Sequence, residues 1–434
     1  MKILSITYNP YNNNNNNSKT LRSFFDGIPS KDLAMLYMES FSEVDYNFCD
    51  NYYRVTDQDV LRSVVKLQFK TRNTHPKEKL QKVSEEKIVA LTRSKRTALR
   101  RLVREFFWNF NTWDTKEFDE WIQEQKPDII FTLLGANIFM HNIVLKISKR
   151  YNIPFVAYYT DDYVLNCSDK TFWGRIHFKL TNKVYRKTMS KTSKSYVIGE
   201  LMQKDYSKAF NREFGLLGNC IDLDKFNSLL PPQINTSDKI TISFIGGLHL
   251  NRWQTVCDLG EIVKEINREK HWNIEINVYA LELKDDIVQR LKACGVDYKG
   301  GLNSQGVFET IKTSDILLHV ESFDEVNRTF VKYSVSTKIT EYLASKRCIM
   351  AYGPHEVASI ALIKDNDFGC VLTDLDSRED KKQKIITAIE TYNDKDYSKQ
   401  WDYVQQYYNK DVVREMLLKD MQAVVDNHFL NSNI

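Results

Sequence analysis

Short apolar runs alternate with helix-like segments along the whole chain, and this rhythm restricts its fold more than any other feature. The runs of the first half include KILSIT (2–7), DIIFTLL (128–134), PFVAYY (154–159) and SYVIG (195–199), and a helical pattern, NIVLKISKRY (142–151), separates two of them. Parallel strands need a long crossover between them, usually a helix. Alternating strands and helices therefore predict an α/β fold, with a parallel sheet covered by helices on both faces.

The same rhythm restarts after a break at PPQINTSDK, near residue 231, which is a linker candidate because of its Pro, Asn and Ser content. A new strand, ITISFIGG (240–247), follows at once, and helices then alternate with further strands such as IEINVYA (274–280). The length of 434 residues suffices for two domains of ordinary size. The predicted parts are a first domain over residues 1–232, a second over residues 233–394, and a helical segment, residues 395–434, that packs back across both.

Composition indicates a soluble globular protein of a reducing compartment. Hydrophobic residues make up 42% and charged residues 27%, and no run of eighteen apolar residues occurs. The apolar stretch after Met1 is too short for a secretory signal. Seven scattered cysteines form neither a CxxC pair nor a Cys/His cluster, which favours free thiols and argues against a zinc site. We therefore expect a cytoplasmic protein.

Positive charge is concentrated in one segment. From Arg62 to Arg104, fourteen Lys and Arg stand against three Glu, so this segment carries +11; the net charge is +4, and the rest of the chain therefore carries 4 − 11 = −7. Such a segment suits an anionic partner, which could be membrane headgroups, a phosphorylated carrier or nucleic acid. The alternative is a solvated helical face with no partner.

A glycine pair follows the first strand of the second half, in FIGGLHLNRW (244–253). Glycines such as Gly246 and Gly247 let backbone amides approach an anion closely, and the start of a helix attracts phosphate. Arg252 adds a two-pronged cation that suits a diphosphate. The loop matches neither GxxxxGK[ST] nor GxGxxG, and the alternative is a structural turn with a surface arginine.

A second helix start combines hydroxyls, a cation and a carboxylate in YSVSTKITEYLASKRCIMAYG (333–353). Ser336 or Thr337 is the expected N-cap, and Lys338 stands beside the first turn, where a phosphate would bind. Glu341 lies one turn further on and could accept hydrogen bonds from two ribose hydroxyls. The alternative is a purely structural capping arrangement.

Carboxylates follow strands elsewhere in the chain. Asp161 and Asp162, in YYTDDY (158–163), could bind a metal, hold a sugar hydroxyl or act as a base, or they could simply form a turn. Two Asp-x-Asp patterns, Asp222 with Asp224 and Asp374 with Asp376, are interpreted as turns, because no other metal ligand stands near them in the sequence.

These segments, in their order, resemble a known family. SFIGGLHLNRW, SDILLHVES (314–322) and STKITEYLASKRCIMAYGP are similar to the donor-binding domain of GT-B glycosyltransferases, most of all the retaining family 4 type of bacterial polysaccharide assembly. LAMLY (33–37), IPFVAYYTDDY and VIGELMQKDY fit the first domain of that family. The resemblance implies two Rossmann-like domains with parallel sheets facing across a cleft, the first binding the acceptor and the second a nucleotide sugar.

The resemblance also implies roles for single residues of the glycine loop. Gly246, Gly247 and Arg252 would cradle the donor diphosphate. Many members carry an arginine directly after the first glycine and a lysine five positions on, whereas this chain has Gly247 and Arg252 there. One of the two cations is therefore missing, and Lys338 is expected to supply the lost charge.

In the second segment, Ser336, Thr337 and Lys338 would receive the diphosphate, and Glu341 would bind the ribose. Members of the family carry another glutamate eight positions earlier, near the donor sugar, but Tyr333 stands there in this chain. This difference leaves the donor-sugar contacts and the retaining outcome open.

The implied activity is a hexosyl transfer from a nucleotide-diphosphate sugar to a glycan or polyprenyl-diphosphate-linked acceptor in cell-surface polysaccharide synthesis. It would be retaining and independent of a metal, with no cofactor besides the donor. Lys338 would stabilise the leaving diphosphate, and Asp161 and Asp162 would face the acceptor. The segment 62–104 would then contact an anionic membrane surface at the inner face of the cell membrane, rather than nucleic acid.

Two other hypotheses fit parts of the sequence. A nucleotide-sugar epimerase of the same fold would need acid–base groups beside the sugar, for which His249 and His319 are the best placed. A non-enzymatic binder of anionic membrane surfaces would use the basic segment alone.

Overall fold

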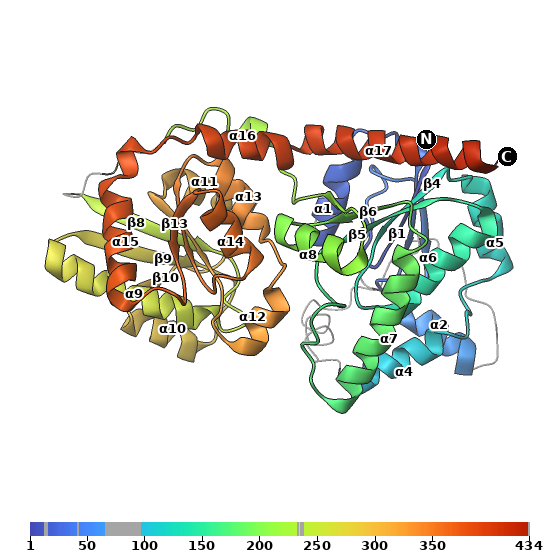
Figure 1. Ribbon diagram of the computed structural model, residues 1–434, viewed down its shortest axis with the longest axis horizontal. Helices are drawn as coiled ribbons and strands as arrows, with labels where there is room; N and C mark the ends of the chain where they lie inside the picture. The colour runs from blue at the N-terminus through green and yellow to red at the C-terminus, as the bar shows by residue number, and fades with distance from the viewer. Residues whose placement is uncertain (13–15, 41–42, 66–96, 232–233, 235–237, 433–434) are drawn as a thin grey trace. The chain divides into compact units, whose positions relative to one another are not determined.

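The computed structural model describes residues 1–12, 16–40, 43–65, 97–231, 234 and 238–432 (Figure 1). The chain forms two compact units. Unit 1 consists of residues Met1–Ile198, Gln203–Leu217 and Val413–Ile434, and unit 2 of residues Gly199–Met202 and Gly218–Val412.

The main division between the units falls between Leu217 and Gly218, whereas the sequence suggested a linker near residue 231. The reason is that the segment before this linker packs on unit 2. The Lys346 ammonium donates to the carbonyl oxygen of Leu229 (2.9 Å), and the Arg347 guanidinium donates to that of Leu230 (2.6 Å).

A parallel sheet forms the centre of unit 1. Among the described residues it has seven strands in the order β3-β2-β1-β4-β5-β6-β7, and every pairing is parallel. Its inner strands are almost wholly buried, as expected for strands covered on both faces. The strands are β1 (Ile3–Thr7), β2 (Leu33–Tyr37), β3 (Asn51–Arg54), β4 (Ile129–Leu133), β5 (Phe155–Tyr159), β6 (Lys194–Val197) and β7 (Gly215–Leu216).

Helices connect and cover these strands. Several begin at a hydroxyl N-cap: Thr97, Thr115 and Thr171 each accept a hydrogen bond from a backbone N–H of the first turn. The helices are α1 (Asn16–Phe25), α2 (Asp57–Val65), α4 (Ala98–Trp108), α5 (Lys116–Gln125), α6 (Ile138–Tyr151), α7 (Phe172–Met189), α8 (Glu200–Phe210) and α17 (Lys410–Ser432).

Unit 2 repeats the plan with a second parallel sheet. In the described part of the chain this sheet has six strands in the order β10-β9-β8-β11-β12-β13. Two parallel sheets with crossover helices confirm the predicted α/β fold class. The strands are β8 (Lys239–Ile245), β9 (Asn273–Tyr279), β10 (Val296–Tyr298), β11 (Ile316–Val320), β12 (Cys348–Tyr352) and β13 (Gly369–Leu372).

The helices of unit 2 enclose a core of aliphatic side chains. Because β8 pairs with β11 and β11 with β12, the carboxyl ends of these three strands lie at one edge of the sheet, where the helices that follow them begin. The helices are α9 (Arg252–Lys270), α10 (Asp285–Ala293), α11 (Ser304–Thr313), α12 (Glu325–Val331), α13 (Thr337–Ala344), α14 (Ala358–Asp365), α15 (Arg378–Glu390) and α16 (Ser398–Tyr407).

The segment predicted as residues 395–434 is divided between the two units. α16 belongs to unit 2, where the Gln400 amide donates to the carbonyl oxygen of Leu343 (2.9 Å). From Val413 onward, α17 belongs to unit 1. A buried stripe with a spacing of four residues fixes it there: Val413, Leu417, Met421 and Val425.

No helix in the described ranges is both long enough and apolar enough to cross a lipid bilayer.

Candidate functional site

The glycine loop of unit 2 is a tight turn between β8 and α9. Gly246 extends the pairing of β8 with β9, since its N–H donates to the carbonyl oxygen of Tyr279 (2.9 Å), and it has a φ of 155°. A Cβ on Gly247 would lie 2.5 Å from Nδ1 of His249, so the imidazole packs directly on this glycine. Leu250 and Asn251 are both left-handed, and the turn ends with Arg252 as the first residue of α9.

Arg252 is held by Glu321, which directly follows β11. Nε of Arg252 donates to Oε2 of Glu321 and Nη2 donates to Oε1, both over 2.9 Å. The side chains are only 16% and 3% exposed. Burial raises the pKa of Glu321, and the neighbouring Arg252 counteracts this. The two-pronged face that the sequence analysis assigned to a diphosphate is therefore engaged by Glu321, and Nη1, 3.4 Å from Nε2 of His249, lies outside this pair.

Two further contacts support the Arg252–Glu321 pair. The Thr255 hydroxyl, one turn into α9, donates to the carbonyl oxygen of Glu321 (2.9 Å). His319 lies beside the carboxylate, and its Nε2 is 2.9 Å from the Ser359 hydroxyl. Burial, helped by the charge of Arg252, lowers the pKa of His319 to about 3, so the imidazole is neutral at physiological pH.

The start of α13 combines a cap with an ion pair. Ser336 is the N-cap, and its hydroxyl accepts a hydrogen bond from the backbone N–H of Lys338 (3.3 Å). Thr337 is the first helical residue. The Lys338 ammonium lies 2.7 Å from Oε2 of Glu341, and both side chains are half-buried. The residue predicted to bind the ribose, Glu341, and the residue predicted to bind the diphosphate, Lys338, are thus direct neighbours.

A hydrogen bond joins this helix to the glycine loop. The backbone N–H of Ile245, the last residue of β8, donates to the phenol oxygen of Tyr342 (3.3 Å), which follows Glu341 in α13. Both predicted phosphate-binding segments therefore belong to one edge of one sheet. Arg252 and Lys338 each have a carboxylate partner of their own, Glu321 and Glu341 respectively.

Asp162 has a structural role in unit 1. Its carboxylate accepts hydrogen bonds from the backbone N–H groups of Val164, Leu165 and Asn166 (2.8–2.9 Å) and from the phenol of Tyr206 (2.9 Å). A carboxylate with its lone pairs engaged in this way is a poor base, so the geometry favours the turn interpretation over the catalytic one. Asp161, which accepts from the hydroxyl of Thr160 (3.2 Å), is partly exposed.

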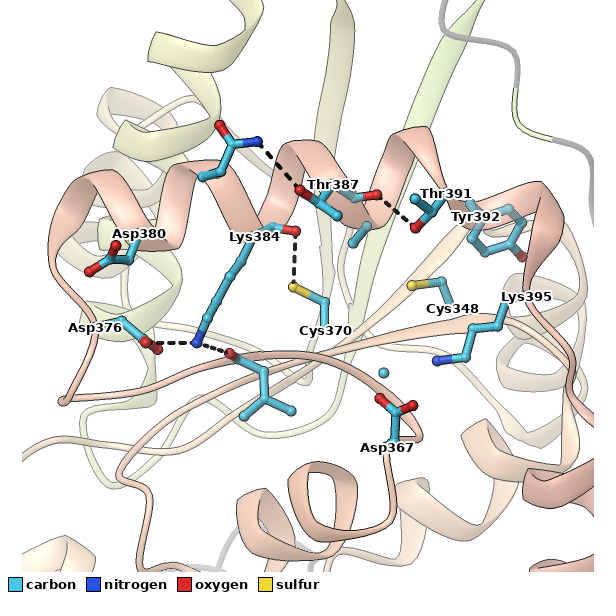
Figure 2. A pocket seen from close by; sticks show the side chains of 14 residues that line it. Cys348, Asp367, Cys370, Asp376, Asp380, Lys384, Thr387, Thr391, Tyr392 and Lys395 are labelled. Atoms are coloured by element: carbon cyan, nitrogen blue, oxygen red, sulfur yellow. Dashed lines mark hydrogen bonds and ion pairs between the residues drawn. The ribbon is translucent and has the colours of Figure 1, made fainter.

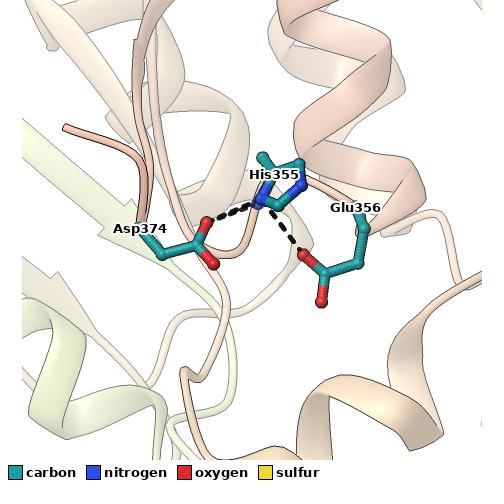
Figure 3. A group of neighbouring side chains, drawn as sticks. All are labelled: His355, Glu356 and Asp374. Atoms are coloured by element: carbon teal, nitrogen blue, oxygen red, sulfur yellow. Dashed lines mark hydrogen bonds and ion pairs between the residues drawn. The ribbon is translucent and has the colours of Figure 1, made fainter.

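Three residues of types that can ligate a metal lie together in the loops after β12 and β13 (Figure 3). Ligand atoms of His355, Glu356 and Asp374 lie within 4.8 Å of one another, and Nδ1 of His355 is 2.9 Å from Oδ1 of Asp374. Arg328 forms ion pairs with both carboxylates. A cation would have to displace this guanidinium, so we interpret the group as an ion-pair network. Asp376 closes a turn, as expected, by accepting from the backbone N–H of Thr373 (2.8 Å).

Sequence reasoning did not find a cavity of about 680 Å³ along β13 and α15 (Figure 2). Cys348 and Cys370 lie at its base, and Lys384, which pairs with Asp376 over 2.6 Å, lines its side. Burial raises the pKa of the Cys348 thiol to about 11 and that of the Cys370 thiol to about 12. Both thiols are therefore protonated at physiological pH and unreactive.

Comparison with known proteins identifies the fold. Neither protein-family models nor curated protein sequences give a match. Among solved structures, an N-terminal domain of trehalose-6-phosphate phosphatase from Candida albicans matches with a TM-score of 0.61 at 10% identity, over 98% of this chain and 97% of that chain. A UDP-forming alpha,alpha-trehalose-phosphate synthase from Burkholderia xenovorans, in complex with glucose-6-phosphate, matches with a TM-score of 0.60 at 7% identity, over 97% and 100%. TarM matches with a TM-score of 0.58 at 11% identity, over 96% and 98%. The chain therefore has the GT-B fold of glycosyltransferases.

Proposed function

We propose that this protein is a glycosyltransferase that moves a sugar from a nucleotide-diphosphate sugar to a glycan or polyprenyl-diphosphate-linked acceptor. The observation that carries the proposal is the edge of the unit 2 sheet, where the Tyr342–Ile245 hydrogen bond joins the glycine loop to the Lys338–Glu341 pair. Binding beyond the carboxyl ends of parallel strands is the rule for ligands of such sheets. The matched UDP-forming synthase supports a nucleotide sugar as the donor class.

Lys338 and Glu341 are suited to the two halves of a nucleoside diphosphate. Without ligand they neutralise each other over 2.7 Å. A bound donor would replace this single contact by two: its diphosphate would take the ammonium, and its ribose hydroxyls would donate to the carboxylate. Both side chains are half-buried, which strengthens such charge-assisted hydrogen bonds relative to those at an exposed site.

Arg252 would act on the leaving group from a fixed position. Glu321 holds two of its nitrogens, and Nη1 lies outside that pair. A cation that is oriented before the reaction stabilises developing charge at no cost in reorganisation. With Lys338, Arg252 would supply the positive charge that other transferases take from a metal, and we therefore propose metal-independent transfer with no further cofactor.

The acceptor side of the proposal lies in unit 1. Asp162 is used by its own loop, which leaves Asp161 as the carboxylate that could orient an acceptor hydroxyl. The base that removes the proton of this hydroxyl would be an oxygen of the donor phosphate, as is thought for retaining members of family 4. We propose a retaining hexosyl transfer of that kind. The setting we propose is cell-surface polysaccharide synthesis on the cytoplasmic side of the membrane.

A panel of UDP-, GDP- and ADP-sugars tests this function. We expect one nucleotide class to bind by calorimetry, and its nucleoside diphosphate to be released when a lipid-linked acceptor is added. Lys338→Ala should weaken binding about tenfold, by removing one charge-assisted contact. Lys364→Ala, which removes an exposed lysine of α14, serves as the matched control.

Three outcomes would contradict the proposal. The first is that no nucleotide binds the wild-type protein, and the second is that both lysine variants behave alike. The third is an isomerised nucleotide sugar formed without acceptor, which would support the epimerase instead. The neutral state of His319 argues against that alternative, because a neutral imidazole with a pKa of about 3 cannot act as the acid near pH 7.

A further inference from the structure

An apolar stripe on α4 of unit 1 faces solvent. Leu99, Val103, Phe106 and Phe110 are 45%, 48%, 59% and 47% exposed. Leu99, Val103 and Phe106, with spacings of four and three residues, lie along one line of the helix, away from the buried face that includes Trp108, and Phe110 lies in the turn that follows the helix. Burial of an apolar stripe is the usual role of an amphipathic helix in a globular domain. Here the buried face of α4 is a different one, and the exposed stripe is available to a partner.

α7 packs beside α4 and carries large apolar side chains of its own (Figure 1). Phe172 is 70% exposed, Trp173 44% and Leu180 46%. Residues of both helices, among them Arg101 and His177, line one small cavity, so the two helices form a continuous face. We call the seven exposed apolar side chains and the basic side chains around them the α4–α7 surface.

The charge of the α4–α7 surface has one sign. α4 contributes the exposed cations Arg100 and Arg101, since its third arginine, Arg104, pairs with Asp57, and α7 contributes five further cations. Against these seven exposed cations, the two helices contain one carboxylate, Glu105, which is buried. The five cations of α7 are Arg175, Lys179, Lys183, Arg186 and Lys187, and all are exposed.

We propose that the α4–α7 surface binds an anionic lipid bilayer, with α4 lying in the plane of the interface. Aromatic and aliphatic side chains surrounded by cations, with few acidic groups, are the pattern of helices that enter the headgroup region. Protein interfaces are depleted in Lys at their core. The bases of a single-stranded nucleic acid would stack on the aromatic rings, but they would not stack on the aliphatic side chains of Leu99, Val103 and Leu180.

α4 is fixed to unit 1 as a rigid platform. Arg104 donates to Asp57 (2.7 Å) and Asn137 (2.9 Å), and the Trp108 indole also donates to Asp57 (2.8 Å). The Glu105 carboxylate accepts from the first backbone N–H groups of α6, including that of Phe139 (2.8 Å). α4 is therefore already folded, and its exposed stripe is in place, before it meets a membrane. The sequence placed a membrane partner on residues 62–104; residues 66–96 lie outside the described part, and the structure adds α7 to the surface.

Membrane binding extends the proposed function, since a lipid-linked acceptor would be reached from this surface. The test of membrane binding does not require catalysis. The full chain is sedimented with phosphatidylcholine vesicles that contain either no or roughly 30% phosphatidylglycerol, at about 0.1 M salt. We expect binding to the anionic vesicles and little to the neutral ones. Phe106→Ser with Trp173→Ser should weaken it about tenfold, through lost apolar burial. Lys179→Gln with Lys183→Gln should weaken it about fivefold per cation.

Matched changes in unit 2 are the controls. Leu281→Ser with Leu375→Ser removes two exposed leucines, and Lys284→Gln with Lys292→Gln removes two exposed lysines; neither pair should change vesicle binding. The glutamine variants keep the test decisive if the serine variant fails to fold.

The proposal is overturned if neutral and anionic vesicles bind alike, or if variants and controls lose binding equally. Two observations made in the absence of vesicles would also overturn it: self-association of the wild type, or its binding to an oligonucleotide, if either is lost in the Phe106→Ser, Trp173→Ser variant and kept in the controls. A Lys338→Ala protein that binds vesicles like the wild type, but nucleotide about tenfold more weakly, separates this surface from the donor site.

Discussion

Arg252 and Glu321 form a buried ion pair with two hydrogen bonds of 2.9 Å between the start of α9 and the end of β11. They are 69 residues apart in the sequence and meet because β8 and β11 are neighbours in the sheet. The pair fixes the orientation of the arginine before any ligand arrives, so its loss should affect both the stability of unit 2 and its affinity for a donor.

Removing one partner of this pair should destabilise unit 2 strongly. Arg252→Met leaves the Glu321 carboxylate buried and uncompensated, which costs about 3–5 kcal/mol in the free energy of unfolding. The double change Arg252→Met with Glu321→Leu should be far milder, since apolar groups of similar volume need no partner. Urea unfolding of Arg252→Met, Glu321→Leu and the double variant measures all three free energies. If the effects of the two single changes simply add in the double variant, the pair is not coupled.

Glu341 should accept hydrogen bonds from the ribose hydroxyls of the donor. Glu341→Ala should weaken binding of the nucleoside diphosphate about ten- to a hundredfold, because a hydrogen bond to a charged group contributes ~1.5–3 kcal/mol. A 2′-deoxynucleotide should bind the wild type less well, and the variant should no longer distinguish it from the ribonucleotide.

Titration calorimetry with both nucleotides gives the comparison. Glu309→Ala removes an exposed glutamate of α11 and should keep full discrimination. A Glu341→Ala protein that discriminates as well as the wild type would exclude this carboxylate from the ribose site.

Glu105 should make the stability of unit 1 depend on pH. Burial raises the pKa of this carboxyl from 4.5 to about 7, although it accepts from the backbone N–H groups of Ile138 and Phe139. The folded state therefore holds a proton that the unfolded state releases. Its stabilising effect is complete below pH 4.5 and is lost as the pH rises through about 7, on the order of 3 kcal/mol in total.

Unfolding measured across this pH range should show that slope in the wild type and a flatter curve in Glu105→Gln. Glu120→Gln, a change at an exposed residue of α5, should keep the wild-type slope. An unchanged slope in Glu105→Gln would mean that other groups cause the pH dependence.

The sequence predicted those strands whose burial on both faces makes them continuous apolar runs, such as β1 and β12. It did not reveal β7, which has two residues, because so short a strand depends on its neighbour rather than on a pattern of its own. It placed Lys338 and Glu341 on one helix, where a spacing of three residues fixes their contact.

Contacts between distant segments could not be predicted from the sequence. The pairing of Arg252 with Glu321 depends on strand order, and the saturation of Asp162 depends on how one loop folds back on its own carboxylate. Spacing in the sequence encodes neither. A residue type that suits catalysis, such as Asp after a strand, suits a turn equally well until its hydrogen-bond partners are known.

The buried stripe of α17 should be essential to unit 1. Leu417→Ala removes a fully buried side chain and should destabilise unit 1 by about 2–5 kcal/mol. Met416→Ala, at the adjacent and exposed position, should stay within ~0.5 kcal/mol of the wild type. Thermal unfolding of both variants provides the comparison, and equal losses would contradict the assignment of α17 to the core.

Because unit 1 takes most of its final helix from Val413 onward, it is completed only after unit 2 has been synthesised. When Leu217 leaves the ribosome, all the described strands of its sheet have been synthesised, but the buried stripe of α17 is still almost two hundred codons away. The nascent chain must therefore carry an incomplete first domain while unit 2 is made, and for that period it is a substrate for chaperones. A stop codon directly after Val412 would therefore damage unit 1, although all residues of unit 2 would have been synthesised.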